Sequence, residues 1–147
     1  QLVDNFPDIL IVVVDIIWVV IMMLLMCDNL ICAHTKDKDI VRKGICEIAK
    51  VLLGDDTQRK LSMLFCLDWF MDPYYQQDIS DIHDDLVLLL QTVITEPNED
   101  DVIEDAIELL MSYELPPFPL IEEKRNRIPL KFQDDIAYLL DPKSFEE

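Results

Sequence analysis

The sequence predicts an all-α protein, and its composition provides two observations in favour. Glycine occurs only at Gly44 and Gly54, whereas Leu, Ile, Asp and Glu dominate the chain. β-Barrels and β-sandwiches need many glycine turns, so these folds are disfavoured. Two glycines placed so far apart also cannot form a Gly-rich phosphate loop, which argues against nucleotide binding. At 147 residues, the chain is expected to form one domain with its own core.

The first predicted helix, 7–28, is unusually apolar. From Ile9 to Cys27, eighteen of nineteen residues are apolar, and Asp15 is the exception. This length would cross a bilayer, but an acid near the middle costs about 2.5–3.5 kcal/mol on insertion scales. No basic segment precedes the stretch, which argues against a secretory signal. A helix buried on nearly all sides is the preferred interpretation, with a partner or second copy covering it, and a membrane span is the alternative.

A helix pair is predicted over 40–71, after a polar link at His34–Asp39. The first helix, Ile40–Leu53, repeats apolar residues at spacings of three and four, which indicates one buried face. Gly54 is expected just beyond its end.

The second helix of this pair, Thr57–Met71, is expected to be capped by Asp55 or Asp56. Asp72-Pro73 ends it, because proline disfavours helical geometry in the preceding residue. Its inward positions are predicted to be Leu61, Leu64, Phe65 and Leu67.

A second pair is predicted over 82–113. Helix Ile82–Thr95 has little polar face, as expected of an inner member of a stack. The turn Glu96-Pro97-Asn98 leads into Glu99–Tyr113, a strongly amphipathic helix with an apolar stripe of Val102, Ile103, Ala106, Ile107 and Leu110. A short helical pair at 117–141 completes the chain.

The two longer pairs repeat at a regular interval. Helices beginning near Ile40 and Asp56 are followed, forty-two and about forty-three residues later, by helices near Ile82 and Glu99. This is the period of HEAT and armadillo helix pairs. Asp101-Val102-x-x-x-Ala106-x-x-x-Leu110 resembles the second helix of a HEAT unit, although Gln58, Ser62 and Cys66 stand at the equivalent places of the first pair.

The resemblance implies a short HEAT-like α-solenoid of about seven helices, stacked as antiparallel pairs in a single helical-repeat domain over 1–147. Such folds are chiefly binding scaffolds. A narrower resemblance concerns bacterial immunity proteins, which block a co-encoded toxin. The small size, the acidity, the helical make-up and the tail Tyr113-Glu-Leu-Pro-Pro-Phe-Pro-Leu-Ile-Glu122 are similar to theirs.

The formal charge of −18 is unevenly distributed, with −2 over 1–50 and −16 over 51–147. From Leu61 to Glu123 there are sixteen acids and neither lysine nor arginine. Such a surface repels nucleic acid and anionic lipid, and it accelerates encounter with a basic partner at low salt. Acids in a first helical turn pair with the helix dipole, but Glu104, Asp105 and Glu108 lie further along.

These acids, with two tyrosines that follow Pro73, form the predicted partner-binding surface. Aromatic residues beside acids are typical of interface hot spots, whereas Trp69 and Phe70 are expected in the core. The alternative explanation of the acids is solubility. The predicted residues are Asp72, Tyr74, Tyr75, Asp78, Asp81, Asp85, Asp101, Glu104, Asp105 and Glu108.

No metal site, cofactor or catalytic residue is predicted. Cys27, Cys32 and His34 match no common zinc spacing, and His83 has no second histidine nearby, so a solvated helix start is expected there. No serine lies in a nucleophile motif. The four cysteines lie in apolar helical context without a CxxC pair, which indicates buried free thiols and a reducing cytoplasm.

The sequence therefore favours a non-enzymatic module that binds a basic protein, most simply an immunity-type inhibitor that neutralises a toxin. Two alternatives stay open: an adaptor or scaffold fragment of a larger HEAT-repeat protein, and a membrane-anchored helical protein using 9–27. A homodimer through the apolar first helix is compatible with each.

Overall fold

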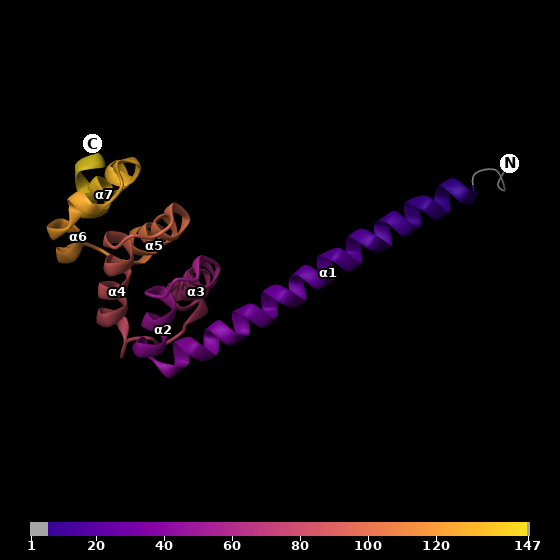
Figure 1. Cartoon of the computed structure of the whole chain (residues 1–147), viewed down its shortest axis with the longest axis horizontal. Coiled ribbons are helices and arrows are strands. Elements are labelled where there is room, and N and C mark those ends of the chain that lie inside the picture. The colour runs from indigo at the N-terminus through magenta and orange to yellow at the C-terminus, as the bar shows by residue number, and fades with distance from the viewer. Residues whose placement is uncertain (1–5, 147) are drawn as a thin grey trace. The chain divides into compact units, whose positions relative to one another are not determined.

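The computed structural model describes the backbone of residues 6–146 and the side chains of residues 12–22 and 36–146. Within that part the chain forms seven α-helices, four 3₁₀ helices and no strand (Figure 1). The all-α prediction is confirmed. The chain divides into two compact units, Gln1–Lys36 and Asp37–Glu147.

Helix α1 (Phe6–Lys43) is continuous. The predicted polar link at His34–Asp39 is therefore wrong, since the helix passes through it. The chain breaks at Gly44, whose φ of 111° lies in the left-handed region that favours glycine. Helix α2 (Ile45–Leu52) follows. The predicted helix Ile40–Leu53 is thus divided between α1 and α2.

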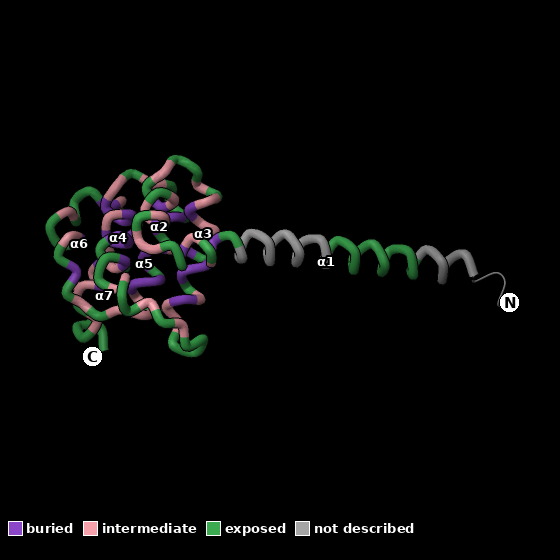
Figure 2. The backbone as a smooth tube through the Cα atoms, turned by 90° about the horizontal axis from the view of Figure 1, so that it is seen from below, coloured by how far each residue is buried: buried purple, intermediate pink, exposed green. Residues whose placement is uncertain are grey.

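Residues 12–22 of α1 are exposed on every face of the helix (Figure 2). Trp18 is 62% exposed, and the valines, isoleucines and methionine around it are similarly open. The chain's own helices therefore do not bury these eleven residues, so the predicted burial would require a partner or a second copy. The remainder of the apolar stretch, at 9–11 and 23–27, lies outside the residues whose side chains are described.

No helix is long and apolar enough to span a membrane among the residues that the structure describes. Within the apolar stretch 9–27, the structure describes the side chains of residues 12–22 only.

Helix α3 (Thr57–Met71) begins and ends where the sequence predicts. The Asp56 carboxylate accepts the backbone N–H of Arg59 at 3.2 Å, which caps the first turn. A 3₁₀ turn, η1 (Pro73–Tyr75), follows Asp72.

Helices α4 (His83–Thr95) and α5 (Asp100–Tyr113) each start within one residue of the prediction. The C-terminal part consists of shorter elements: α6 (Pro119–Glu123), η2 (Arg125–Arg127), η3 (Leu130–Phe132), α7 (Gln133–Leu140) and η4 (Pro142–Phe145).

Helix α5 occupies the middle of unit 37–147, in contact with α3, α4 and α7. Helix α2 contacts α3 and α4, and α4 contacts α6. Helices α3 and α5 run in the same direction, since one hydrogen bond links the start of α3 to the start of α5 and another links their ends. Lys60 Nζ donates to Asn98 Oδ1 at 2.6 Å just before α5, and the Tyr113 hydroxyl donates to Asp68 at 2.5 Å.

The core is formed by the inner faces of α2 to α7 (purple in Figure 2). The predicted apolar stripe of α5 is fully buried, which confirms it. On α3 the register differs from the prediction. Phe65 is 67% exposed, whereas Met63, Cys66 and Phe70 are buried beside Leu64 and Leu67.

An acid within the predicted link is completely buried. Asp37 accepts hydrogen bonds from Arg59 Nη1 at 3.2 Å and from the Ser62 hydroxyl, both on α3. Lys38, the next residue, places its ammonium 4.0 Å from the centre of the Trp69 ring. These polar contacts attach the last turns of α1 to α3 within unit 37–147.

Candidate protein-binding surface

One face of α5 carries four acids, which we call the α5 acidic row: Asp101, Glu104, Asp105 and Glu108. They lie opposite the buried stripe at helical spacings of three and four, so they are neighbours on the helix surface. Asp105 is half-buried and the other three are exposed. Burial raises the pKa of Asp105, and the charges of Glu108, Glu104 and Asp101 raise it further. The row is thus a site of mutual repulsion.

No lysine or arginine forms an ion pair with this row within residues 12–22 and 36–146. Lys131 acts on it only through the charges of Glu104 and Asp101, which help to raise the pKa of that lysine after its hydrogen bond to Asp100. The nearby cations have other partners: Lys131 Nζ lies 2.5 Å from Asp100, and Lys124 Nζ and Arg127 Nη1 lie 3.8 and 4.0 Å from Glu96. The basic cluster of the C-terminal segment therefore neutralises acids that flank the start of α5. It leaves the α5 acidic row without an ion pair in the described part of the chain.

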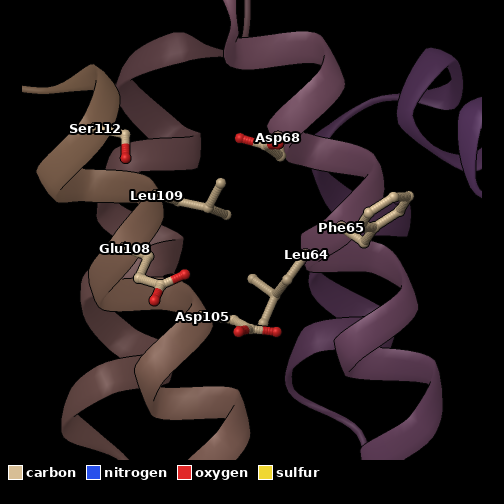
Figure 3. A pocket seen from close by; sticks show the side chains of 7 residues that line it. All are labelled: Leu64, Phe65, Asp68, Asp105, Glu108, Leu109 and Ser112. Carbon is tan, nitrogen blue, oxygen red and sulfur yellow. The ribbon is translucent and has the colours of Figure 1, made fainter.

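A groove of about 170 Å³ lies between α3 and α5 (Figure 3). Leu64 and Leu109 point into the space between the two helices, and the carboxylates of Asp68 and Asp105 lie above and below them. Glu108, Phe65 and Ser112 complete the lining. Lysine and arginine have an apolar stem and a cationic head. The groove thus matches such a side chain, with leucines for the stem and carboxylates for the head.

A second hollow, of about 160 Å³, lies on the other side of the α5 acidic row. Glu104 and Glu108 line it together with Ile107, Met111 and Asp135 of α7. The row is consequently flanked on both sides by recesses with apolar and acidic walls.

Tyr113 connects the groove with the end of α3. Its hydroxyl donates to Asp68, and this hydrogen bond raises the pKa of Tyr113 well above the usual value. Burial and the charges of Asp68, Asp72 and Tyr75 act in the same direction. Two residues of the predicted surface, Asp72 and Tyr75, therefore lie within electrostatic reach of the end of α5.

The predicted tyrosines form an aromatic group with Trp69. The ring centres of Tyr74 and Tyr75 are 5.2 Å apart, and those of Tyr75 and Trp69 are 5.5 Å apart. Asp72 holds the turn by accepting the backbone N–H of Tyr74 at 2.9 Å. Tyr74 is 83% exposed, and Phe70 is buried, as predicted for each. Trp69 is only half-buried.

The remaining predicted acids lie elsewhere. Asp78 and Asp81 line a separate hollow that also contains Arg42 and Phe70. Hydrogen bonds from Ser80 lower the pKa of Asp78. Asp85 is exposed on the first turn of α4. The structure thus groups the α5 acidic row with Asp68, and it places Asp78 and Asp81 around a different recess.

His83 joins the start of α4 to the end of α5. Its Nε2 lies 2.7 Å from Glu114 and its Nδ1 lies 3.2 Å from Asp84. These hydrogen bonds, to Asp84 and then to Glu114, raise the pKa of His83. Both ring nitrogens contact carboxylates, so the contacts favour the charged imidazolium.

Within the described residues, no three metal-ligating side chains form a group. Cys27, Cys32 and His34 lie outside the described side chains. Of the other cysteines, Cys66 is buried as predicted, and burial raises its pKa to about 12. Cys46 is exposed, so the prediction of a buried thiol is wrong at that position.

Asp68, Leu64, Leu109 and Ser112 line the groove but are not among the site residues predicted from the sequence. The groove joins α3 to α5, which begins forty-three residues later, so its lining leaves no local sequence pattern. No family model, curated protein or solved structure matches the chain.

Proposed function

We propose that unit 37–147 is a non-enzymatic module that binds a basic protein through the α5 acidic row and the adjacent groove. The observation that carries this proposal is the geometry of the α5 acidic row: four carboxylates at helical spacings of three and four lie beside the groove, and none forms an ion pair with a lysine or arginine in the described part of the chain. A cation from outside would relieve the repulsion among these carboxylates. Binding would therefore stabilise the folded unit.

The helix contacts support a scaffold role. Helices α3, α5 and α7 are successive neighbours, as are α2, α4 and α6. We interpret these two rows as a short HEAT-like stack in which α5 is an inner helix, covered on both sides. An inner helix presents a rigid row of side chains, which lowers the entropic cost of binding.

An immunity-type inhibitor is the form of this function that we favour. The partner would then be a basic toxin domain, occluded by the acidic surface and by the tyrosines at η1. Electrostatic attraction of this kind mainly increases the association rate, and it is screened by salt. An adaptor that binds through shape and apolar contacts would depend less on these charges.

The test is binding of an arginine-rich peptide to the full chain, followed by fluorescence anisotropy at low and high salt. A triple variant, Glu104→Gln, Asp105→Asn and Glu108→Gln, is compared with a control triple, Glu122→Gln, Glu123→Gln and Asp141→Asn. Both change the net charge equally, and the control acids are exposed. We expect at least a tenfold loss of affinity for the first triple and less than a threefold loss for the control.

Equal losses in the two triples would contradict a defined site, because they would indicate general attraction to an anionic protein. Charge reversal at Glu104, Asp105 and Glu108 distinguishes an adaptor from an inhibitor. An adaptor should keep its affinity for its own partner after this change. For the inhibitor form, the product of the neighbouring gene should co-purify with the chain. Its toxicity to growing cells should be abolished by the wild-type chain and retained with the first triple.

A further inference from the structure

The exposed part of α1 needs an environment other than water. Eleven consecutive residues, 12–22, are exposed, and ten of them are valine, isoleucine, tryptophan or methionine. They cover three turns, so no face of this segment is polar apart from Asp15. A helix that is apolar all round is found in the core of a large protein or in a membrane.

We propose that 9–27 is a membrane-spanning anchor surrounded by lipid hydrocarbon. The backbone is helical throughout this stretch, as part of α1. Nineteen residues at 1.5 Å each give about 28 Å, close to the roughly 30 Å hydrocarbon core of a bilayer. A length chosen for packing against a protein surface has no reason to match this thickness.

The distribution of apolar residues favours lipid over a second copy of the chain. A helix that pairs with its own copy buries a stripe at two positions of each seven, with polar residues at the other positions. Here every position other than Asp15 is apolar from Ile9 to Cys27. A paired helix would leave most of these side chains in water, whereas a bilayer covers all of them.

The flanking charges agree with a span. The residues that follow the stretch, 28–43, contain Lys36, Lys38, Arg42 and Lys43. Basic residues near the end of a span mark its cytoplasmic side, and acidic residues have little influence. These four cations therefore favour a cytoplasmic position for unit 37–147, with its α5 acidic row.

The proposal is independent of the partner-binding function, and vesicle flotation tests it. The full chain is translated in the presence of phosphatidylcholine vesicles, washed at alkaline pH and floated on a density gradient. The test variant is Ile17→Arg with Val20→Arg. The control is Leu53→Arg with Leu130→Arg, which adds the same charge at exposed apolar positions of unit 37–147.

We expect the wild type and the control to float with the vesicles. The floating fraction of the test variant should be at least tenfold smaller. Wild-type chain that stays at the bottom of the gradient overturns the proposal, whether dispersed or aggregated. A water-soluble dimer that Ile17→Arg with Val20→Arg dissociates would assign the helix to a second copy. Flotation of the test variant would also contradict insertion.

The orientation has its own test in bacterial spheroplasts that express the chain. External protease should leave unit 37–147 intact until the membrane is opened with detergent. Digestion of that unit in sealed spheroplasts would overturn the assigned side.

Discussion

At the scale of single residues, Asp37 and Asp105 differ in how their carboxylate charge is compensated. Asp37 is fully buried and is satisfied by Arg59 and Ser62. Asp105 is half-buried among like charges, and its pKa rises. The first arrangement stabilises the fold, whereas the second weakens it and leaves attraction available for a cation. Carboxylates with so little compensation are candidates for function rather than stability.

Replacement of Asp37 by alanine should destabilise the protein by about 1–3 kcal/mol, because Ser62 and Arg59 lose a buried acceptor. The measurement is urea unfolding of the full chain, followed by far-UV circular dichroism. Asp39→Ala is the matched control, since Asp39 forms only an exposed pair with Arg42 at 3.7 Å. Its expected cost is below about 1 kcal/mol. Equal costs for the two substitutions would contradict the role assigned to Asp37.

His83 should make stability depend on pH above its ordinary value of 6.5. Its folded pKa is raised, so the stabilisation by Asp84 and Glu114 is complete below about pH 6.5 and is lost as the pH rises through the folded pKa. The contribution is small, because the ring is 45% exposed. His83→Gln should remove this part of the pH dependence in unfolding curves between pH 6 and 9. An unchanged pH profile would show that the pair contributes nothing.

At the scale of elements, local sequence signals were sufficient for α3, α4 and α5. Asp56 and Asp72-Pro73 bound α3 by capping and by the restriction on residues before proline, and both act within a few residues. The sequence could not predict that α1 continues through His34–Asp39. Its polar residues resemble a loop, and the partners of Asp37 lie twenty-two and twenty-five residues away. Such long-range contacts leave no local pattern.

Gly44 should be the position that separates α1 from α2. Gly44→Ala would force an L side chain into a backbone conformation of φ 111° and ψ −178°, which is essentially restricted to glycine, at a cost of about 1–3 kcal/mol. Nothing lies within 4 Å of the added Cβ, so the cost arises from the backbone alone. Urea unfolding measures it, with Ser112→Ala on the exposed side of α5 as a control. A cost below 0.5 kcal/mol would show that the positive φ is not required.

The energetics of α1 favour insertion of 9–27 despite its acid. Thirteen isoleucine, leucine and valine residues in this stretch contribute about 0.3–0.6 kcal/mol each, or about 4–8 kcal/mol together. Asp15 opposes them with about 2.5–3.5 kcal/mol on the same scale. Asp15→Leu should therefore increase the fraction of chain that floats with vesicles. A decrease would indicate that Asp15 contacts a polar partner within the membrane.

At the scale of the whole chain, the sequence predicted the helical class and the place of greatest negative charge. It did not predict the division at Lys36 and Asp37, because a polar helical segment does not reveal where its contacts lie. It also could not show which acids would be neutralised. Lys131 and Asp100 are thirty-one residues apart, and only the fold brings them to 2.5 Å. The acids of the α5 acidic row are among those that form no ion pair in the described part of the chain.

The most direct test of the acidic surface is an NMR titration of the Asp105 carboxyl, with and without a saturating arginine-rich peptide. Without the peptide, Asp105 should titrate above the ordinary value of 3.8. With the peptide, its pKa should fall, because an adjacent cation favours the charged form. An ordinary pKa that the peptide leaves unchanged would contradict the proposal that these carboxylates form a binding site for a basic partner.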